Sequence, residues 1–357
     1  MGSGSGARKY VVMGILIVLA LAIAGLITGA IGAGLTQSEE SKLAGETAEG
    51  PFIPVPAVHL PAQVIFPISD RAHYRDFLNA EAAEKANGED SLSHEQHELI
   101  EEGPYQGNNF IITNTMLSSW IASVLLVLMF ALGARKAALV PGRFQNFIEI
   151  AIEGLLNFVQ GVVGRENSRM IFPVIATIFL FVIFNAWIGL IPIYQSLGFK
   201  EGDLIQIHLL RPAGTDMNMP LALALISFVY VEYLGFKMLG FGYITKFVRI
   251  RSLKHGVSSL FRLRFLDAFQ SLLDFFFVGP LEAFSEFVRL ISFTFRLFGN
   301  MTAGEILVLV SAFLVPFVAT VGVYGLELLV GFIQALIFAG LTLVFASIAI
   351  TAHGESH

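Results

Sequence analysis

The stretch LEAFSEFVRLISFTFRLFGNMTAGEILVLVSAFLV, from Leu281 to Val315, decides the fold of this chain. It is apolar over 35 residues, and Pro280 and Pro316 bound it. As a helix it measures about 50 Å at about 1.5 Å per residue, whereas the hydrocarbon layer of a bilayer is only about 30 Å thick. We therefore predict a membrane helix that is long and steeply tilted. It nevertheless contains Glu282, Glu286, Arg289, Arg296 and Glu305.

A second apolar stretch of 36 residues, from Phe317 to Ala352, follows Pro316. The two stretches predict a hairpin of two long helices. Shorter stretches, each with at most one charge and near the roughly 20 residues that a membrane helix needs, occur at Val11–Leu35, Phe110–Ala134, Ile171–Tyr194 and Met219–Phe236. The predicted fold class is therefore an all-α, polytopic membrane protein with six crossings.

The composition agrees with this fold class and excludes several functions. Hydrophobic residues make up 55% of the chain and charged residues 14%, whereas soluble domains have about 25% charged residues. The net charge of −6 lacks the basic footprint of a nucleic-acid-binding protein. The absence of Cys excludes disulfides, Cys-based metal sites and a thiol nucleophile. The sequence has no Gly-rich phosphate loop, so we expect neither direct nucleotide binding nor a cofactor.

The stretch Phe144–Gly164 has a different pattern. Apolar residues repeat at helical spacing on one side, and Glu, Gln and Asn occupy the other side. This amphipathic pattern predicts a helix that lies in the membrane interface. The alternative is an ordinary amphipathic helix packed on a soluble core.

Basic residues set the predicted orientation, because they accumulate on cytoplasmic loops. The loop between Gly242 and Phe265 contains six Lys and Arg and no acidic residue, whereas Thr36–Asn108 contains 14 of the 28 acidic residues. We therefore place this loop and both termini in the cytoplasm, and Thr36–Asn108 outside.

The orientation suggests three regions. Residues 1–35 form an N-terminal anchor helix, with a cleaved signal peptide as the alternative. Residues 36–108 form an acidic extracytoplasmic segment, which we expect to be a weakly ordered or accessory element with a helix within Arg71–Glu102. In that segment, His94 and His97 next to several Glu indicate a solvated face more than a metal site. Residues 109–357 form the membrane core.

A stripe of polar residues follows one face of the first long helix. Its members are separated by steps of three and four residues, which keeps them on one face: Glu282, Ser285, Arg289, Ser292, Arg296 and Asn300. A charge at the bilayer centre costs about 2.5–3.5 kcal/mol on insertion scales. Salt bridges between helices would explain one Glu–Arg pair but not a continuous stripe. The stripe therefore predicts an ion pathway. In the second long helix Glu327 and Gln334, seven residues apart, also share a face.

Arg296 divides this pathway. Arg stays protonated at any working pH, whereas a buried Glu can exchange a proton. On the predicted topology Glu282 and Ser285 lie on the cytoplasmic side of Arg296, and Glu305 and Glu327 lie on the outer side. The pattern predicts two offset proton paths separated by a fixed positive charge.

The segment FRLFGNMTAGE, Phe295–Glu305, resembles the signature of subunit a of the F-type rotary ATP synthase. Three further segments are similar to that family: Phe184–Pro192, Thr215–Asn218 and Gly331–Ala335. The likeness extends from about Ile112 to Ala352. It implies a membrane subunit that is not catalytic alone and that couples proton flow to ring rotation and ATP synthesis.

The resemblance also implies roles for individual residues. Arg296 would be the essential arginine that faces the carboxylates of the c-ring, with Gln334 as its polar companion. The outer half-channel would be lined by Asn300, Glu305, Glu327, Asp216 and Asn218, and the inner one by Glu282, Ser285 and Ser292. Some members pair a His with a Glu across the two long helices, whereas this chain has Glu305 and Glu327, which would titrate as a coupled pair.

The resemblance implies the c-ring and the peripheral-stalk b subunits as partners, within the lipid bilayer of a bacterial plasma membrane. H⁺ is the expected ion, with Na⁺ left open. A self-contained secondary transporter is the main alternative, but the chain has no duplicated pattern of the kind that such transporters show. An intramembrane hydrolase would need a motif such as H-E-x-x-H, which is missing. A purely structural anchor would leave the polar stripe unexplained.

Overall fold

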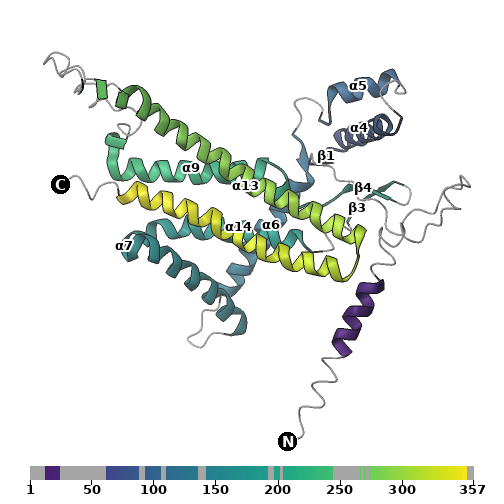
Figure 1. Cartoon of the computed structure of the whole chain (residues 1–357), viewed down its shortest axis with the longest axis horizontal. Helices are drawn as coiled ribbons and strands as arrows, with labels where there is room; N and C mark the ends of the chain where they lie inside the picture. The colour runs from purple at the N-terminus through teal and green to yellow at the C-terminus, as the bar shows by residue number, and fades with distance from the viewer. Residues whose placement is uncertain are drawn as a thin grey trace, which may run out of the picture. The chain divides into compact units, whose positions relative to one another are not determined.

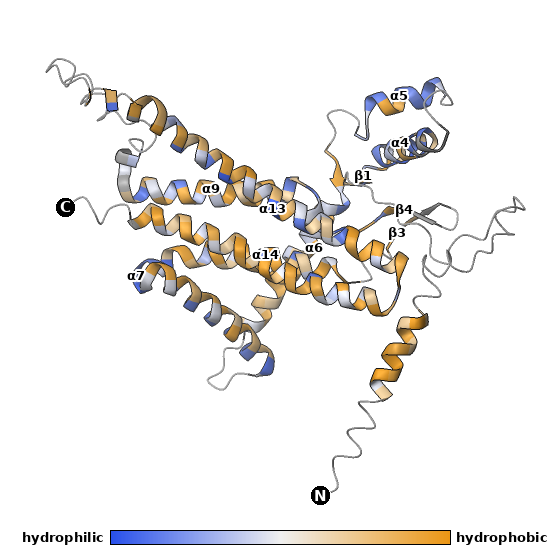
Figure 2. Ribbon diagram, viewed as in Figure 1, coloured by the Kyte–Doolittle hydropathy of each residue, from blue (hydrophilic) through white to orange (hydrophobic). Residues whose placement is uncertain are grey.

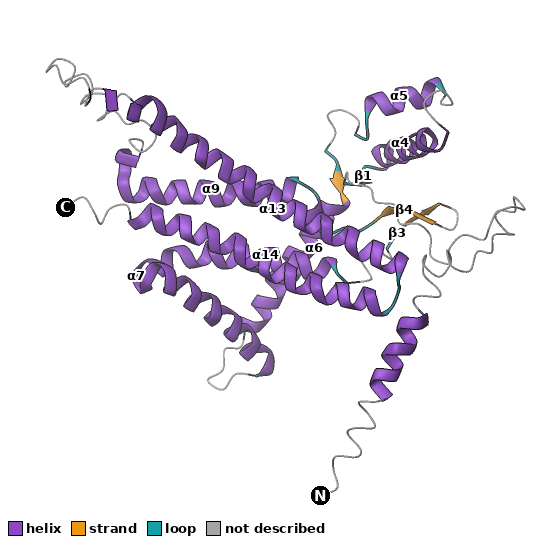
Figure 3. Cartoon of the chain, viewed as in Figure 1, coloured by secondary structure: helices purple, strands orange, loops and turns teal. Residues whose placement is uncertain are grey.

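Helices make up most of the computed structural model (Figure 3). It describes residues 13–24, 62–87, 93–105, 110–135, 142–191, 197–201, 204–243, 266, 269–270 and 273–351. Of the first predicted span only Met13–Ala24, a helix, lies within these residues. Most of the basic loop between Gly242 and Phe265, and the tail after Thr351, lie outside them.

The described helices are α4 (Ile68–Asn87), α5 (His94–Glu102), α6 (Asn114–Ala134), α7 (Arg143–Gly189), α9 (Asn218–Leu239), α13 (Gly279–Leu314) and α14 (Val318–Thr351). Short 3₁₀ turns occur at Ala213–Thr215 and Gly240–Tyr243, and a π-helical turn, Asp274–Val278, precedes α13. The strands are β1 (Val64–Phe66), β2 (Ile112–Thr113), β3 (Gly198–Glu201) and β4 (Leu204–His208). Within the described residues, five helices are long and apolar enough to cross a membrane: α6, α7, α9, α13 and α14. The predicted all-α, polytopic membrane fold is confirmed, and the sixth crossing, of which only Met13–Ala24 is described, stays a prediction.

The two predicted long helices are α13 and α14, drawn in green to yellow in Figure 1. They contain 36 and 34 residues, so each is about 50 Å long. α13 ends at Leu314 and α14 begins at Val318, which leaves Pro316 in the turn. Phe317 in this turn has a φ of 68°, in the left-handed region that non-glycine residues seldom adopt. The long helices are thus confirmed, and their tilt in the membrane stays a prediction.

α7 joins the predicted interfacial helix to the third predicted span. The two parts are separated at Gly164, whose φ of 75° and ψ of 168° are not helical. This backbone conformation is available to glycine because it has no Cβ. The second part ends at Gly189 and not at the predicted Tyr194, in accord with Pro192, which disfavours helical backbone in the residue before it.

The chain divides into two compact units. The first contains residues 1–118, 186–215 and 299–332, and the second contains residues 119–185, 216–298 and 333–357. α6, α7, α13 and α14 contribute to both units.

The second unit is a bundle of membrane helices. In its core, Ile171, Ile175 and Val182 of α7, Leu234 of α9 and Leu343 of α14 are fully buried. Ser227 and Thr342 share a hydrogen bond of 2.8 Å that joins α9 to α14. The rings of Phe293 and Phe338, 5.1 Å apart, join α13 to α14.

The first unit contains the described part of the acidic segment, whose helices α4 and α5 are polar (Figure 2). The single helix predicted within Arg71–Glu102 is two helices, α4 and α5. Ser93 and Gln96 form a capping box at the start of α5. β1 pairs with β2 in an antiparallel ribbon, and Val64, Tyr74 and Ile207 form a buried cluster. Burial, and to a smaller degree the nearby Tyr105, raises the pKa of the Tyr74 phenol.

In the described part, Val64 and Tyr74 of this segment pack with Ile207 of β4 in a small apolar cluster, and the expectation of a weakly ordered or accessory element stays a prediction. β1 also pairs with a strand beyond residue 108. The division of the chain at residues 35 and 108 stays a prediction.

Candidate functional site

Arg296 lies on an exposed face of α13. Its Nη2 donates a hydrogen bond to Ser292 Oγ, one turn earlier, at 3.3 Å. Its guanidinium carbon is 6.0 Å from the centre of the Phe293 ring, and the neighbouring Phe295 is 54% exposed. No carboxylate forms an ion pair with Arg296 in the part of the chain that the structure describes. A fixed positive charge on an apolar helix therefore has no counter-charge from the described residues of its own chain.

Gln334 lies in the same unit as Arg296 and is 5% exposed. The contact between Phe293 and Phe338 fixes the register of two antiparallel helices. Arg296 comes three residues after Phe293 on α13. Ala335, the neighbour of Gln334, comes three residues before Phe338 on α14. Gln334 is thus level with Arg296. No hydrogen bond joins the two, and Gln334 Nε2 is buried without a partner among the described residues.

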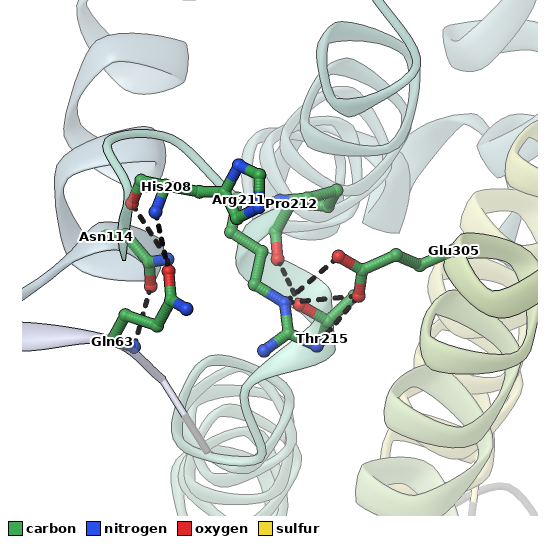
Figure 4. A network of polar contacts seen from close by, with 7 residues as sticks. All are labelled: Gln63, Asn114, His208, Arg211, Pro212, Thr215 and Glu305. Carbon is green, nitrogen blue, oxygen red and sulfur yellow. Dashed lines mark hydrogen bonds and ion pairs between the residues drawn. The ribbon is translucent and has the colours of Figure 1, made fainter. Parts of the chain in front are cut away.

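Glu305 forms a buried ion pair with Arg211 in the first unit (Figure 4). Arg211 Nε donates to both carboxylate oxygens at 3.1 Å, and Nη2 donates to Oε2 at 2.8 Å. The side chains of Arg211 and Glu305 are 8% and 12% exposed. Sequence reasoning missed Arg211, because it lies in a loop without helical periodicity. The only signal was an arginine four residues before the Thr215–Asn218 segment.

A hydrogen-bond network precedes Arg211 in the chain (Figure 4). Gln63 N–H donates to Asn114 Oδ1 at 3.1 Å, and Asn114 Nδ2 donates to the His208 carbonyl at 3.3 Å. The His208 N–H donates to Gln63 Oε1 at 2.8 Å. Three residues later, the Arg211 N–H donates to Ser118 Oγ of α6 at 3.0 Å. The start of α6 and the end of β4 thereby fix the backbone that carries Arg211.

Glu327 lies against Gly304, so α13 and α14 approach closely in the first unit. A Cβ on Gly304 would collide with the Glu327 carboxylate. Glu305, Glu327 and Tyr324 line one cavity between these helices and Pro212. The space open to the centres of water molecules is about 30 Å³, enough for about two waters. The structure therefore brings together the two glutamates that the sequence placed on the outer side.

Arg289 lies in a second charged cluster, within the second unit. It forms ion pairs with Glu286 of its own helix and, at 3.9 Å, with Glu232 of α9. Its guanidinium lies 4.0 Å from the centre of the Phe345 ring of α14. This part of the stripe is a structural ion-pair cluster that joins three helices, the alternative that the sequence left open for one pair.

The remaining predicted site residues have simpler surroundings. Ser285 and Ser292 are exposed on α13, and Glu282 and Asn300 are partly exposed. Asp216 Oδ1 accepts a hydrogen bond from the Asn218 backbone at 3.1 Å, at the start of α9. Over the described ranges, no three His, Cys, Asp or Glu side chains are grouped so that they could hold a metal ion.

The fold and the site together define a polytopic membrane protein with an ion pathway. Residues 116–347 match the family described as ATP synthase A chain. The chain belongs to this family.

Three relatives, each described as ATP synthase subunit a, show the same likeness. The protein of Gloeobacter violaceus is 35% identical over 243 residues, which cover 68% of this chain and 86% of that protein. The protein of Solidesulfovibrio magneticus is 32% identical over 235 residues, 66% of this chain and 83% of its own. The protein of Desulfosudis oleivorans is 32% identical over 232 residues, 64% of this chain and 85% of its own.

Family membership confirms the function predicted from the sequence. The chain is the proton-conducting stator subunit of the membrane sector of the ATP synthase, a multi-pass membrane protein that is not itself catalytic.

Proposed function

We propose that Arg296 faces the ionisable carboxylates of the c-ring and separates two proton half-channels. The observation that carries this proposal is the exposed guanidinium of Arg296, which has no ion pair among the described residues. An uncompensated charge in a membrane is costly, so a counter-charge from another subunit is the simplest compensation. Gln334, level with Arg296 on α14, is its polar companion.

The half-channels lie on either side of Arg296 along α13. Glu282, Ser285 and Ser292 line the inner half-channel. The outer half-channel is lined by Asn300, Glu305, Glu327, Asp216 and Asn218. The cavity lined by Glu305 and Glu327 supports this assignment, because it has room for the water that proton transfer needs.

Proton flow and ring rotation are coupled by charge. A ring carboxyl that reaches Arg296 loses its proton to one half-channel, because the positive charge favours the carboxylate. The carboxylate that moves past Arg296 takes a proton from the other half-channel before it enters lipid, where an ionised group is costly. Each proton that crosses 100 mV releases about 2.3 kcal/mol, so several are needed for each ATP.

The partners are the c-ring and the peripheral-stalk b subunits, in a bacterial plasma membrane with the C-terminus in the cytoplasm. Mild-detergent purification tests this partnership: co-purification with a ring of small hairpin proteins supports it. A lone protein that transports a solute would indicate a secondary transporter instead.

ATP-driven proton pumping in sealed vesicles tests the role of Arg296. Arg296→Ala should abolish pumping, and Arg296→Lys should impair it, because a buried Lys can lose its proton. Arg143→Gln, which removes an exposed arginine at the start of α7, is the matched control and should pump normally. Full pumping by Arg296→Ala would exclude the proposal.

A further inference from the structure

We propose that Arg211 is a positioning residue that keeps Glu305 a permanent anion, so that Glu327 is the carboxyl that exchanges protons in the outer half-channel. This inference rests on the proposed function. It departs from a relay in which Glu305 and Glu327 share protons as equal partners.

The geometry of the ion pair is the first support. Three hydrogen bonds of 2.8 to 3.1 Å connect the Arg211 guanidinium to both oxygens of Glu305. Charge-assisted bonds to both oxygens are among the strongest that side chains make. A proton on Glu305 would break this arrangement and leave a buried cation without its partner, which is strongly unfavourable.

The cation itself cannot adapt. Arg does not lose its proton in proteins, and the Arg211 backbone is held by Ser118 Oγ at 3.0 Å. The residue that follows is Pro212, whose ring fixes φ. The carbonyl of Pro212 accepts a hydrogen bond from Thr215 Oγ1 at 2.7 Å. A fixed backbone and a permanent charge keep the guanidinium at Glu305.

Glu327 has the opposite surroundings. It is half-buried, lies against Gly304 and lines the same cavity as Glu305. Among the described residues no cation or hydrogen-bond donor pairs with its carboxylate. The titratable or charged groups around the cavity are therefore Arg211 and Glu305, which neutralise each other, and Tyr324 and Glu327. Of the two carboxyls, only Glu327 can change its protonation state without breaking an ion pair.

The test compares ATP-driven proton pumping, over a range of pH, in vesicles that contain the whole ATP synthase. Glu327→Gln should lower the rate about tenfold or more at every pH, because the exchanging carboxyl is lost. Arg211→Gln should also lower it about tenfold or more, because it leaves an unpaired carboxylate in the outer half-channel. The double variant Arg211→Gln with Glu305→Gln removes both charges, so no unpaired carboxylate is left, and its rate should exceed that of Arg211→Gln by about threefold or more.

The exposed ion pair between Arg75 and Asp76, 2.9 Å apart in α4, supplies the matched control. Arg75→Gln with Asp76→Asn should pump at the wild-type rate, because exposed ion pairs contribute little. Arg211→Lys keeps a cation beside Glu305 and should exceed Arg211→Gln by about threefold or more even if the double variant fails to assemble.

Several results would overturn the inference. They are a double variant no faster than Arg211→Gln, a Glu327→Gln variant with the wild-type rate and pH profile, or equal losses in Arg211→Lys and Arg211→Gln. If these occur while Arg296→Ala abolishes pumping, the inference fails and the proposed function stands. If Arg296→Ala pumps normally, the proposed function fails.

Discussion

At the scale of single residues, the chain uses arginine in two different ways. Arg211 is buried and bound to Glu305 at 2.8 Å, whereas Arg296 is exposed on its helix without an ion pair among the described residues. The two side chains carry the same charge, and only their surroundings distinguish them. Arg296 could be predicted from its place in a long apolar helix. Arg211 could not, because its partner is 94 residues away in the chain.

Gly304→Ala tests the position of the Glu327 carboxylate in the cavity. The added Cβ would collide with the Glu327 carboxylate, so the glutamate must move away from its place in the cavity. We expect ATP-driven pumping to fall by about tenfold. Gly322→Ala on α14, where a Cβ meets nothing within 4 Å, should pump normally. Equal rates in the two variants would contradict the placement of Glu327.

Asn114→Ala tests the hydrogen-bond network at the start of α6. Asn114 is fully buried, and its side chain bonds to Gln63 and to the His208 carbonyl. Its loss leaves buried polar groups unsatisfied, at a cost of about 1–3 kcal/mol. We expect faster proteolysis of residues 62–105 in membranes. Asn157→Ala, on the polar side of α7, is the control, and identical cleavage in both variants would show that the network does not hold this segment.

At the scale of elements, the length of the apolar stretches predicted the long helices well, since helix length and apolar content are local properties of a sequence. The break at Gly164 coincides with the end of the predicted interfacial helix. β1 and β2 were not predicted, because strands of 3 and 2 residues are too short to show a period. The two strands pair although they are distant in the sequence, and no local sequence pattern predicts such pairing.

Arg289→Gln tests the ion-pair cluster that joins α9, α13 and α14. The substitution removes the cation shared by Glu232 and Glu286 and the contact with the Phe345 ring. We expect a lower melting temperature of the purified complex, because breaking a buried ion pair leaves uncompensated charge. Pumping at low temperature should persist. Abolished pumping with an unchanged melting temperature would instead place Arg289 in the proton path.

At the scale of the whole molecule, the family match covers residues 116–347, and the acidic segment lies before it. That segment is nevertheless attached to the core of the first unit. β1 pairs with β2, and Gln63 bonds to Asn114 and His208. The sequence separated the two regions by composition, and the structure shows that hydrogen bonds between distant residues join them. Composition indicates where a region is exposed to water, but not what it packs against.

Cross-linking to the c-ring tests the central claim most directly. The chain has no cysteine, so an introduced one is unique in this subunit. Ser292→Cys, exposed one turn before Arg296, should form a disulfide with a cysteine placed beside the ring carboxylate, and Thr294→Cys, on the buried side of α13, should not. A cross-link at position 294 in preference to 292, or at neither, would contradict the claim that the Arg296 face of α13 meets the ring.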